Sequence, residues 1–177
     1  MEFKITSEAT AYTGHIFNVC EREIETPYGT IQRQVVHMYN NAVAFMITDG
    51  ERVLITKEYR SGLNRSIESI PAGKVNDGED YTDALFREIS EEVGISKSSI
   101  DTTTHIATVN SSEGFTDEQV AVYRVDVSPD VIQGDTDFDD GEYITSHWVS
   151  ITEFKSIMLS TPHSAPAVVA ALSIGTK

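Results

Sequence analysis

Three glutamates that lie close together in one predicted helix are the residues of this sequence best suited to chemistry. Glu88, Glu91 and Glu92 are spaced i, i+3 and i+4, so a helix places their carboxylates on one face. Like charges at this spacing repel by roughly 0.2–0.5 kcal/mol per pair, and the negative end of the helix dipole disfavours carboxylates in the last turn. Taken alone, the three glutamates are also consistent with a solvated acidic face. A divalent cation such as Mg²⁺ or Mn²⁺, which prefers hard oxygen ligands, would relieve both unfavourable effects.

These glutamates belong to a longer pattern of fixed residues that begins at Gly73. Five residues separate Gly73 from Glu79, and seven more precede the run Arg87-Glu88-Ile89-Ser90-Glu91-Glu92-Val93-Gly94-Ile95. A chance match to seven fixed identities and two apolar positions in a chain of 177 residues is on the order of 10⁻⁷. The full pattern therefore favours a functional site over a solvated surface.

A strand, a loop and a helix must position this pattern. Residues 66–72 are typical of a short strand, and residues 76–78 of a turn. A helix is predicted over 82–93 because apolar residues recur at i, i+4 and i+8, and Gly94 follows where a helix commonly ends.

Strands outnumber helices in the rest of the chain. Residues 11–25 and 29–39 are predicted to form an N-terminal hairpin, and the apolar run 42–47 a strand buried on both faces. Further strands are expected over 53–59, 106–109, 120–127 and 143–149, and helices over 153–159 and 165–172. Because the two kinds of element do not alternate strictly, the fold class predicted is α+β with a mixed sheet.

Composition excludes several classes of protein. The 28 acidic and 13 basic residues give a net charge of −15, which argues against nucleic acid or an anionic membrane as partner. A small anionic substrate remains compatible, because a bound metal ion inverts the local field. The single cysteine, Cys20, is expected to be buried filler, and no signal peptide or membrane span is apparent, so a cytoplasmic protein is expected.

The pattern from Gly73 to Ile95 is identified as the Nudix box, Gly-x5-Glu-x7-Arg-Glu-U-x-Glu-Glu-x-Gly-U, where U is apolar. The wider chain resembles the ADP-ribose pyrophosphatase branch of the Nudix hydrolases in residues 34–37, 58–60, 70–74, 114–118 and 140–148. The resemblance implies a Nudix α/β/α sandwich with a mixed β-sheet over residues 41–177. It also implies a small N-terminal β subdomain over 1–40 that mediates homodimerisation.

The resemblance implies a metal site within the box. Glu88 and Glu92 resemble the main Mg²⁺ ligands, Glu91 shares a metal, and the backbone carbonyl of Ala72 is a further ligand; Mn²⁺ is an alternative cation.

The remaining box residues resemble positioning groups. Arg87 resembles the catalytic-site arginine that orients a glutamate by ion pairing, and Glu79 is similar to a glutamate that contributes to the metal site less directly. Gly73 and Gly94 resemble residues required for a loop bend and for the end of the helix.

A carboxylate outside the box is expected to accept a proton from the attacking water. By resemblance this base is Glu118, but Glu113 occupies a position where the family pattern has proline. Glu113 and Asp117 therefore remain alternatives.

Two arginines resemble substrate-binding residues of the branch. Arg33 and Arg60 match positions that hold adenine-side or phosphate oxygens, for which a guanidinium is well suited. One position departs from the branch, which has a glutamate four residues before the box glycine. Ser69 stands there, and Glu68 comes one residue earlier, which in a strand points to the opposite face unless a bulge intervenes.

The function expected from the resemblance is Mg²⁺-dependent hydrolysis of a nucleoside diphosphate derivative, with ADP-ribose giving AMP and ribose 5-phosphate as the leading reaction. Another nucleoside diphosphate sugar such as GDP-mannose is the first alternative, and a catalytically silent nucleotide-binding module the second. The acidic stretch 126–142 fails the EF-hand pattern and has no assigned role. The five histidines are interpreted as structural or surface residues.

Overall fold

The structure is a computed structural model that describes residues 2–138, 141 and 143–175. The chain divides into two compact units, which are described separately. The first comprises Met1–Asn41 and Asn110–Gln119, and the second comprises Ala42–Val109 and Val120–Lys177.

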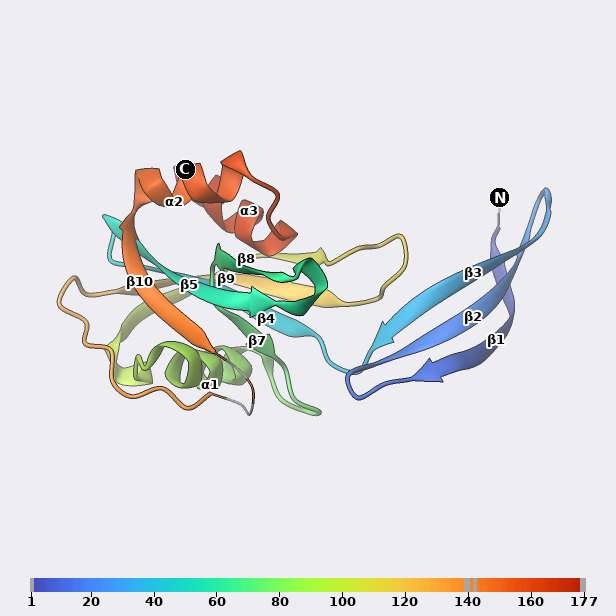
Figure 1. Cartoon of the computed structure of the whole chain (residues 1–177), viewed down its shortest axis with the longest axis horizontal. Coiled ribbons are helices and arrows are strands. Elements are labelled where there is room, and N and C mark those ends of the chain that lie inside the picture. Colours follow the sequence, from blue (N-terminus) through green and yellow to red (C-terminus); the bar gives the residue numbers. More distant parts are fainter. Residues whose placement is uncertain (1, 139–140, 142, 176–177) are drawn as a thin grey trace. The chain divides into compact units, whose positions relative to one another are not determined.

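The first unit is built on a three-stranded antiparallel sheet in the order β1-β2-β3 (Figure 1). Its strands are β1 (Lys4–Thr13), β2 (Phe17–Thr26) and β3 (Gly29–Met38). The hairpin of β2 and β3 was predicted, but the separate strand β1 was not, and the strand expected over 11–25 merges the end of β1 with β2. All ten residues of β1 are exposed. A strand exposed on both faces lacks the apolar alternation on which the prediction depends.

The second unit contains a seven-stranded mixed sheet whose main path is β10-β5-β4-β9-β8, with β6 paired to β5 and β7 to β4. Its strands are β4 (Ala42–Thr48), β5 (Arg52–Arg60), β6 (Arg65–Ser69), β7 (Ala72–Lys74), β8 (Ile100–Asn110), β9 (Gln119–Val127) and β10 (Ile144–Ser150). Strands β4 and β9 are parallel, whereas β4 is antiparallel to β5 and β7. The mixed sheet predicted from the sequence is therefore confirmed.

In the part of the chain that the structure describes, three helices cover the two faces of this sheet. The helix α1 (Tyr81–Val93) lies on one face, and α2 (Ile151–Ser160) and α3 (Ala165–Ser173) lie on the other (Figure 1). Short 3₁₀ turns occupy Ser61–Leu63 and Lys97–Ser99. This arrangement confirms the expected α/β/α sandwich. Among the described residues, no helix is both long and apolar enough to cross a membrane.

Alternating residues of β4 enter the two cores of the sandwich. Phe45 and Ile47 pack in the cluster that contains the buried face of α1, whereas Ala44 and Met46 pack in the cluster that contains α2 and α3. All four are essentially inaccessible to solvent. This explains the continuous apolar run over 42–47, because both faces of the strand are buried.

The strand expected over residues 66–72 is instead two strands with different partners. β6 pairs with β5, and β7 pairs with β4. Pro71 lies between them and has no N–H to donate to a ladder, but its carbonyl accepts a hydrogen bond from the Phe45 N–H at 3.0 Å. The chain thereby changes neighbours immediately before the box glycine.

Candidate active site

The box begins where β7 passes against α1. Gly73 pairs with Val43 in the sheet, and a β-carbon built on Gly73 would lie 1.9 Å from Glu88 Cδ and 2.1 Å from Glu88 Oε2. Any side chain at this position would therefore occupy the space that the Glu88 carboxylate fills. Glycine is needed here because the Glu88 carboxylate closely approaches the backbone of β7.

The Arg87 guanidinium gathers three glutamates of the box. Its Nε and Nη2 donate to the two carboxylate oxygens of Glu79 at 2.9 and 3.0 Å, and Nη2 also donates to the Lys74 carbonyl at 2.8 Å. Its Nη1 donates to Glu88 Oε1 and to Glu91 Oε2, both at 2.8 Å. These bonds match the five N–H donors of a guanidinium, a number that lysine cannot supply. The bonds, first among them those to Glu79, raise the pKa of Arg87 above its ordinary value.

Glu79 closes the loop between β7 and α1. Besides its paired bonds from Arg87, its Oε2 accepts the backbone N–H of Asn76 at 2.9 Å. The hydrogen bonds from Arg87, more than any other influence, lower the pKa of Glu79. The side chain of Asp80 accepts from the Thr82 N–H at 2.7 Å and caps the first turn of the helix.

The four box glutamates carry more negative charge than the arginine can offset. Glu88 and Glu92 are buried, with 8% and 7% of their surface exposed, and the Glu91 side chain is 38% exposed. Glu79, Glu88 and Glu91 all bind the one guanidinium of Arg87, and Glu92 follows Glu88 by one turn on the same face of the helix. Buried carboxylates in excess of local cations are costly unless a further cation is bound. The oxygen-rich donor set and the Gly73 cradle therefore fit a divalent metal ion.

A loop far along the chain, residues 133–137, donates hydrogen bonds to the free carbonyls at the end of α1. Gly94 adopts a left-handed conformation with φ 67°, and a β-carbon there would lie 2.4 Å from the Gly134 carbonyl oxygen. The Gly134 N–H donates to the Gly94 carbonyl at 2.7 Å, the Gln133 amide donates to Val93 O at 3.0 Å, and the Asp137 N–H donates to Glu91 O at 2.9 Å. Neutral N–H groups thus bind carbonyls near the negative end of the helix.

This loop gives part of the acidic stretch 126–142 a structural role that the sequence analysis did not assign. Most of these contacts are made by backbone groups, so residue types carried almost no signal for them. Residues 139, 140 and 142 of the stretch lie outside the described residues.

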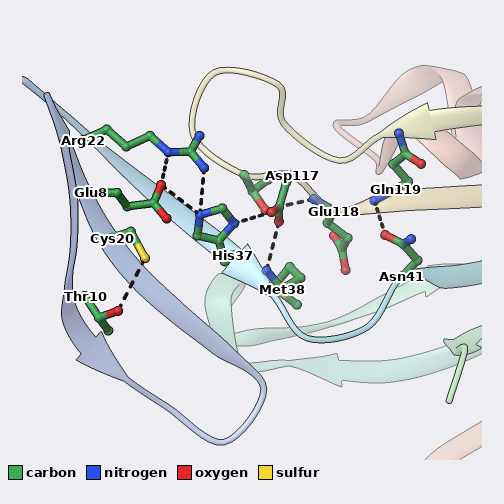
Figure 2. A network of polar contacts seen from close by, with 11 residues as sticks. Glu8, Thr10, Cys20, Arg22, His37, Met38, Asn41, Asp117, Glu118 and Gln119 are labelled. Atoms are coloured by element: carbon green, nitrogen blue, oxygen red, sulfur yellow. Dashed lines mark hydrogen bonds and ion pairs between the residues drawn. The ribbon is translucent and has the colours of Figure 1, made fainter. Parts of the chain in front are cut away.

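The three candidates for the base all lie in the first unit, on the segment that connects β8 to β9. Glu113 is exposed, and Glu118 is partly buried, with a hydrogen bond from the Ser111 hydroxyl to its carboxylate. The Asp117 carboxylate accepts from the Met38 N–H at 3.0 Å and contacts His37 Nδ1 (Figure 2). Burial opposes ionisation of Asp117, but the bonds from His37 and Met38 outweigh it and lower its pKa.

His37 belongs to a polar network that the sequence analysis missed. Arg22 Nη2 lies 2.9 Å from His37 Nε2, and Arg22 Nε is ion-paired to Glu8 (Figure 2). Potential metal-binding atoms of Glu8, Cys20 and His37 lie within 4.8 Å of one another. Arg22 already pairs with Glu8 and contacts His37, so its guanidinium occupies the place of a cation in this cluster. Cys20 is buried, as expected.

The two substrate-binding candidates lie in different units. Arg33 is exposed on β3, where it lines a shallow hollow with Glu21, Gln32 and Gln34, and its Nη1 donates to the Gln32 carbonyl at 2.8 Å. Arg60 ends β5 and forms an ion pair with Glu58 at 2.8 Å. The structure thus brings together the box residues of the second unit, while Arg33 and the candidate bases belong to the first.

Fold and site define the class of protein. The NUDIX domain model matches residues 38–169, which is most of the chain, so the chain belongs to the Nudix family. It is a Nudix hydrolase that resembles ADP-ribose pyrophosphatases, so the family indicated by the box and the branch indicated by the wider chain are both confirmed.

Individual relatives show which members of the family this chain is similar to. The chain is 28% identical to an ADP-ribose pyrophosphatase of Bacillus subtilis (strain 168) over 145 residues, covering 81% of this chain and 76% of that protein. It is 27% identical over 154 residues to an ADP-ribose pyrophosphatase of Mycobacterium tuberculosis, covering 86% and 72%. It is 30% identical over 123 residues to a methanol dehydrogenase activator of Bacillus methanolicus, covering 69% and 65%.

A solved structure agrees in fold. The crystal structure of an ADP compounds hydrolase superposes with a TM-score of 0.75 over 97% of this chain and 91% of that chain, at 20% identity.

Proposed function

We propose that this protein hydrolyses the diphosphate linkage of a nucleoside diphosphate derivative with Mg²⁺ as cofactor, and that its main substrate is ADP-ribose, giving AMP and ribose 5-phosphate. The observation that carries the proposal is the gathering of Glu79, Glu88 and Glu91 around Arg87, with Glu88 against the backbone of Gly73. The names of the relatives from Bacillus subtilis and Mycobacterium tuberculosis support the choice of substrate.

Glu88, Glu91, Glu92 and the Ala72 carbonyl are the proposed metal ligands. When bound, the metal would offset the charge of the diphosphate and lower the pKa of a coordinated water. Arg87 contributes by holding two of these carboxylates at fixed positions with hydrogen bonds of 2.8 Å. A ligand held in place before binding loses less conformational entropy when the metal arrives.

Glu118 is the proposed proton acceptor. Asp117 is a poor base because its carboxylate is engaged by His37 and the Met38 N–H, and these bonds stabilise the ionised form. Glu113 is exposed and has no bond among the described residues that would hold it. The Glu118 carboxylate is steadied by the Ser111 hydroxyl, and a hydroxyl that donates one bond leaves a second carboxylate oxygen able to accept a proton.

Arg33 and Arg60 are the proposed ligands of phosphate or adenine-side oxygens, because a guanidinium binds oxyanions through paired hydrogen bonds.

One observation supports an alternative substrate. β6 pairs with β5 through five consecutive pairs, from Arg60↔Arg65 to Thr56↔Ser69, without a bulge. Glu68 therefore points to the face opposite Ser69, and the departure from the branch pattern is not compensated locally. This favours another nucleoside diphosphate sugar, such as GDP-mannose, as the alternative substrate.

A panel of nucleotide sugars tests the proposal. Initial rates of nucleoside monophosphate release are measured for the wild type, Glu92→Gln and the matched control Glu153→Gln, which changes an exposed glutamate of α2. We expect wild-type turnover of ADP-ribose that a chelator abolishes and Mg²⁺ restores. The Glu92→Gln variant should fall by about 100-fold or more, as expected when a group that positions the reacting centre is lost, and the control should match the wild type.

The outcomes separate the alternatives. Turnover of GDP-mannose well above that of ADP-ribose would replace the leading substrate by the alternative. Tight nucleotide binding by the wild type without Mg²⁺-dependent turnover would identify a silent binding module and overturn the proposed enzyme activity.

We also propose that the N-terminal sheet, residues 1–40, mediates a homodimer. β1 is an edge strand whose ten residues are all exposed, and apolar side chains of this segment are exposed as well, among them Phe3, Ile5, Tyr12 and Tyr28. Unpaired strand edges and exposed apolar patches are typical of interaction surfaces.

Light scattering after gel filtration measures the molecular mass of the protein in solution and tests the dimer. A monomeric mass at micromolar concentration would refute the dimer, and regained activity on mixing inactive Arg33 and Glu92 variants would show that subunits share sites.

A further inference from the structure

The segment that carries the proposed base is attached to the N-terminal sheet at its end. The Val36 N–H donates to the Phe115 carbonyl at 2.7 Å, and the Asp117 N–H donates to the Val36 carbonyl at 3.4 Å. Val36 and Thr116 form an isolated parallel bridge. Residues 115–117 therefore continue the sheet beside β3 as a short fourth chain segment.

Side chains lock this attachment at Asp117. Its Oδ1 accepts the Met38 N–H at 3.0 Å, and its Oδ2 contacts His37 Nδ1 (Figure 2). Both carboxylate oxygens are thus bound by consecutive residues at the end of β3. A carboxylate held through both oxygens has little freedom to rotate or shift.

Arg22 defines which nitrogen of His37 carries the proton. A guanidinium can only donate, so His37 Nε2, at 2.9 Å from Arg22 Nη2, must accept. The proton of the neutral ring then resides on Nδ1 and is donated to Asp117. Glu8 pairs with the same arginine and holds it in place, so the network runs through all three strands of the sheet to the segment 115–117 (Figure 2).

Glu118 lies between two fixed neighbours. Asp117 precedes it and is bound to the end of β3, and the N–H of Gln119, which follows, donates to Asn41 Oδ1 at 3.0 Å. Consecutive Cα atoms are about 3.8 Å apart, so anchoring both neighbours determines where the Glu118 backbone lies. A displacement of about 1 Å in a group that transfers a proton can reduce the rate by about 100-fold.

We propose that His37 is a positioning residue for catalysis, which acts through Asp117 to hold Glu118 in the orientation needed to accept a proton. This inference rests on the proposed function of Glu118 as the base. It assigns His37 no contact with the substrate. The residue should therefore affect kcat and leave KM nearly unchanged.

Steady-state kinetics of full-length variants test the inference. His37→Ala should lower kcat by about 10–100-fold with KM within twofold, and Asp117→Ala should lower it similarly. The double variant should be no worse than the more impaired single variant, because Asp117→Ala already removes the hydrogen bond that His37→Ala removes. His37→Asn keeps an N–H in place of Nδ1–H and should recover kcat to within about threefold of the wild type. Thr6→Ala, which removes a hydrogen bond to Glu23 between β1 and β2, is the matched control and should leave kcat unchanged.

The results distinguish this inference from the proposed function. If Glu118→Gln retains wild-type kcat, the assignment of the base is wrong, and the inference falls with it. If Glu118→Gln is impaired but His37→Ala is not, only the inference is overturned. If His37→Ala does not fold, the comparison of His37→Asn with Asp117→Ala decides the question. Equal loss of kcat in these two variants would refute a role for the donated hydrogen bond.

Discussion

Replacement of Gly73 by alanine should abolish most activity while leaving the fold largely intact. The added carbon would lie 1.9–2.3 Å from the carboxylate atoms of Glu88, and ordinary contact begins near 3.4 Å. The carboxylate must therefore retreat by about 1.5 Å, since it is the flexible end of a side chain and the backbone of β7 is fixed by β4. A displacement of this size at a reacting centre predicts a loss of about 100-fold in kcat, or about 2.7 kcal/mol.

The cost in stability should be smaller than this loss in kcat. Glu88 would lose its bond from Arg87, worth about 1–2 kcal/mol, but its repulsion with the neighbouring Glu92 would ease. The melting temperature should fall by at most about 6 °C for a chain of this size.

Mg²⁺ titrations and thermal melts of two alanine variants measure these effects. Gly62→Ala is the matched control, because a β-carbon at Gly62 meets nothing within 4 Å. We expect Gly73→Ala to need at least 10-fold more Mg²⁺ for half-maximal activity, as for other disturbed metal sites, and Gly62→Ala to behave as the wild type. Equal kcat and equal Mg²⁺ requirement in the two variants would show that Glu88 is not held against Gly73 as a ligand.

Three further perturbations test other parts of the site. Arg87→Lys, which cannot supply five donors, should lower the free energy of unfolding by about 1–3 kcal/mol in urea titrations, whereas an unchanged value would refute the bridging role. The lowered pKa of Glu79 contributes stability that is present at neutral pH and lost as the pH falls below about 4.5 towards the folded-state pKa; Glu79→Gln should therefore show a shallower loss of stability between pH 5 and 3, and parallel curves would contradict this. The added carbon of Gly94→Ala meets the backbone of Gly134, whereas that of Gly78→Ala lies in open space at a similar φ. The free energy of unfolding of Gly94→Ala should therefore be lower than that of Gly78→Ala by about 1–3 kcal/mol, and equal melting temperatures would refute the contact.

The parts of the site that the sequence predicted are those with local causes. Glu88, Glu91 and Glu92 share a face because helical spacing places them there, and Gly94 ends α1 in the left-handed conformation expected of glycine. The two-sided burial of residues 42–47 was visible because apolar residues at consecutive positions require it. In each case the residue types themselves contain the physical reason.

The parts that could not be predicted depend on contacts between distant segments. His37 and Asp117 are separated by 80 positions, and neither spacing nor composition indicates that they meet. The loop over 133–137 binds the end of α1 mainly through backbone N–H groups, which every residue except proline possesses. β1 gave no pattern because none of its residues is buried.

The assignment of Asn110–Gln119 to the same unit as Met1–Asn41 has a consequence for biosynthesis. Strands β1 to β3 leave the ribosome before the segment 110–119, and Val36 and Asp117 cannot form their bonds until residue 117 has been made. Domains synthesised at about 5–20 residues per second usually fold as each is completed, but here the first unit is completed only several seconds later, after residues 42–109 of the second unit have been made. A fragment that starts at residue 42 would also retain segment 110–119 without the strand that binds it. Removal of the N-terminal strands therefore does not leave an intact second unit alone, because segment 110–119 of the first unit stays in the truncated chain.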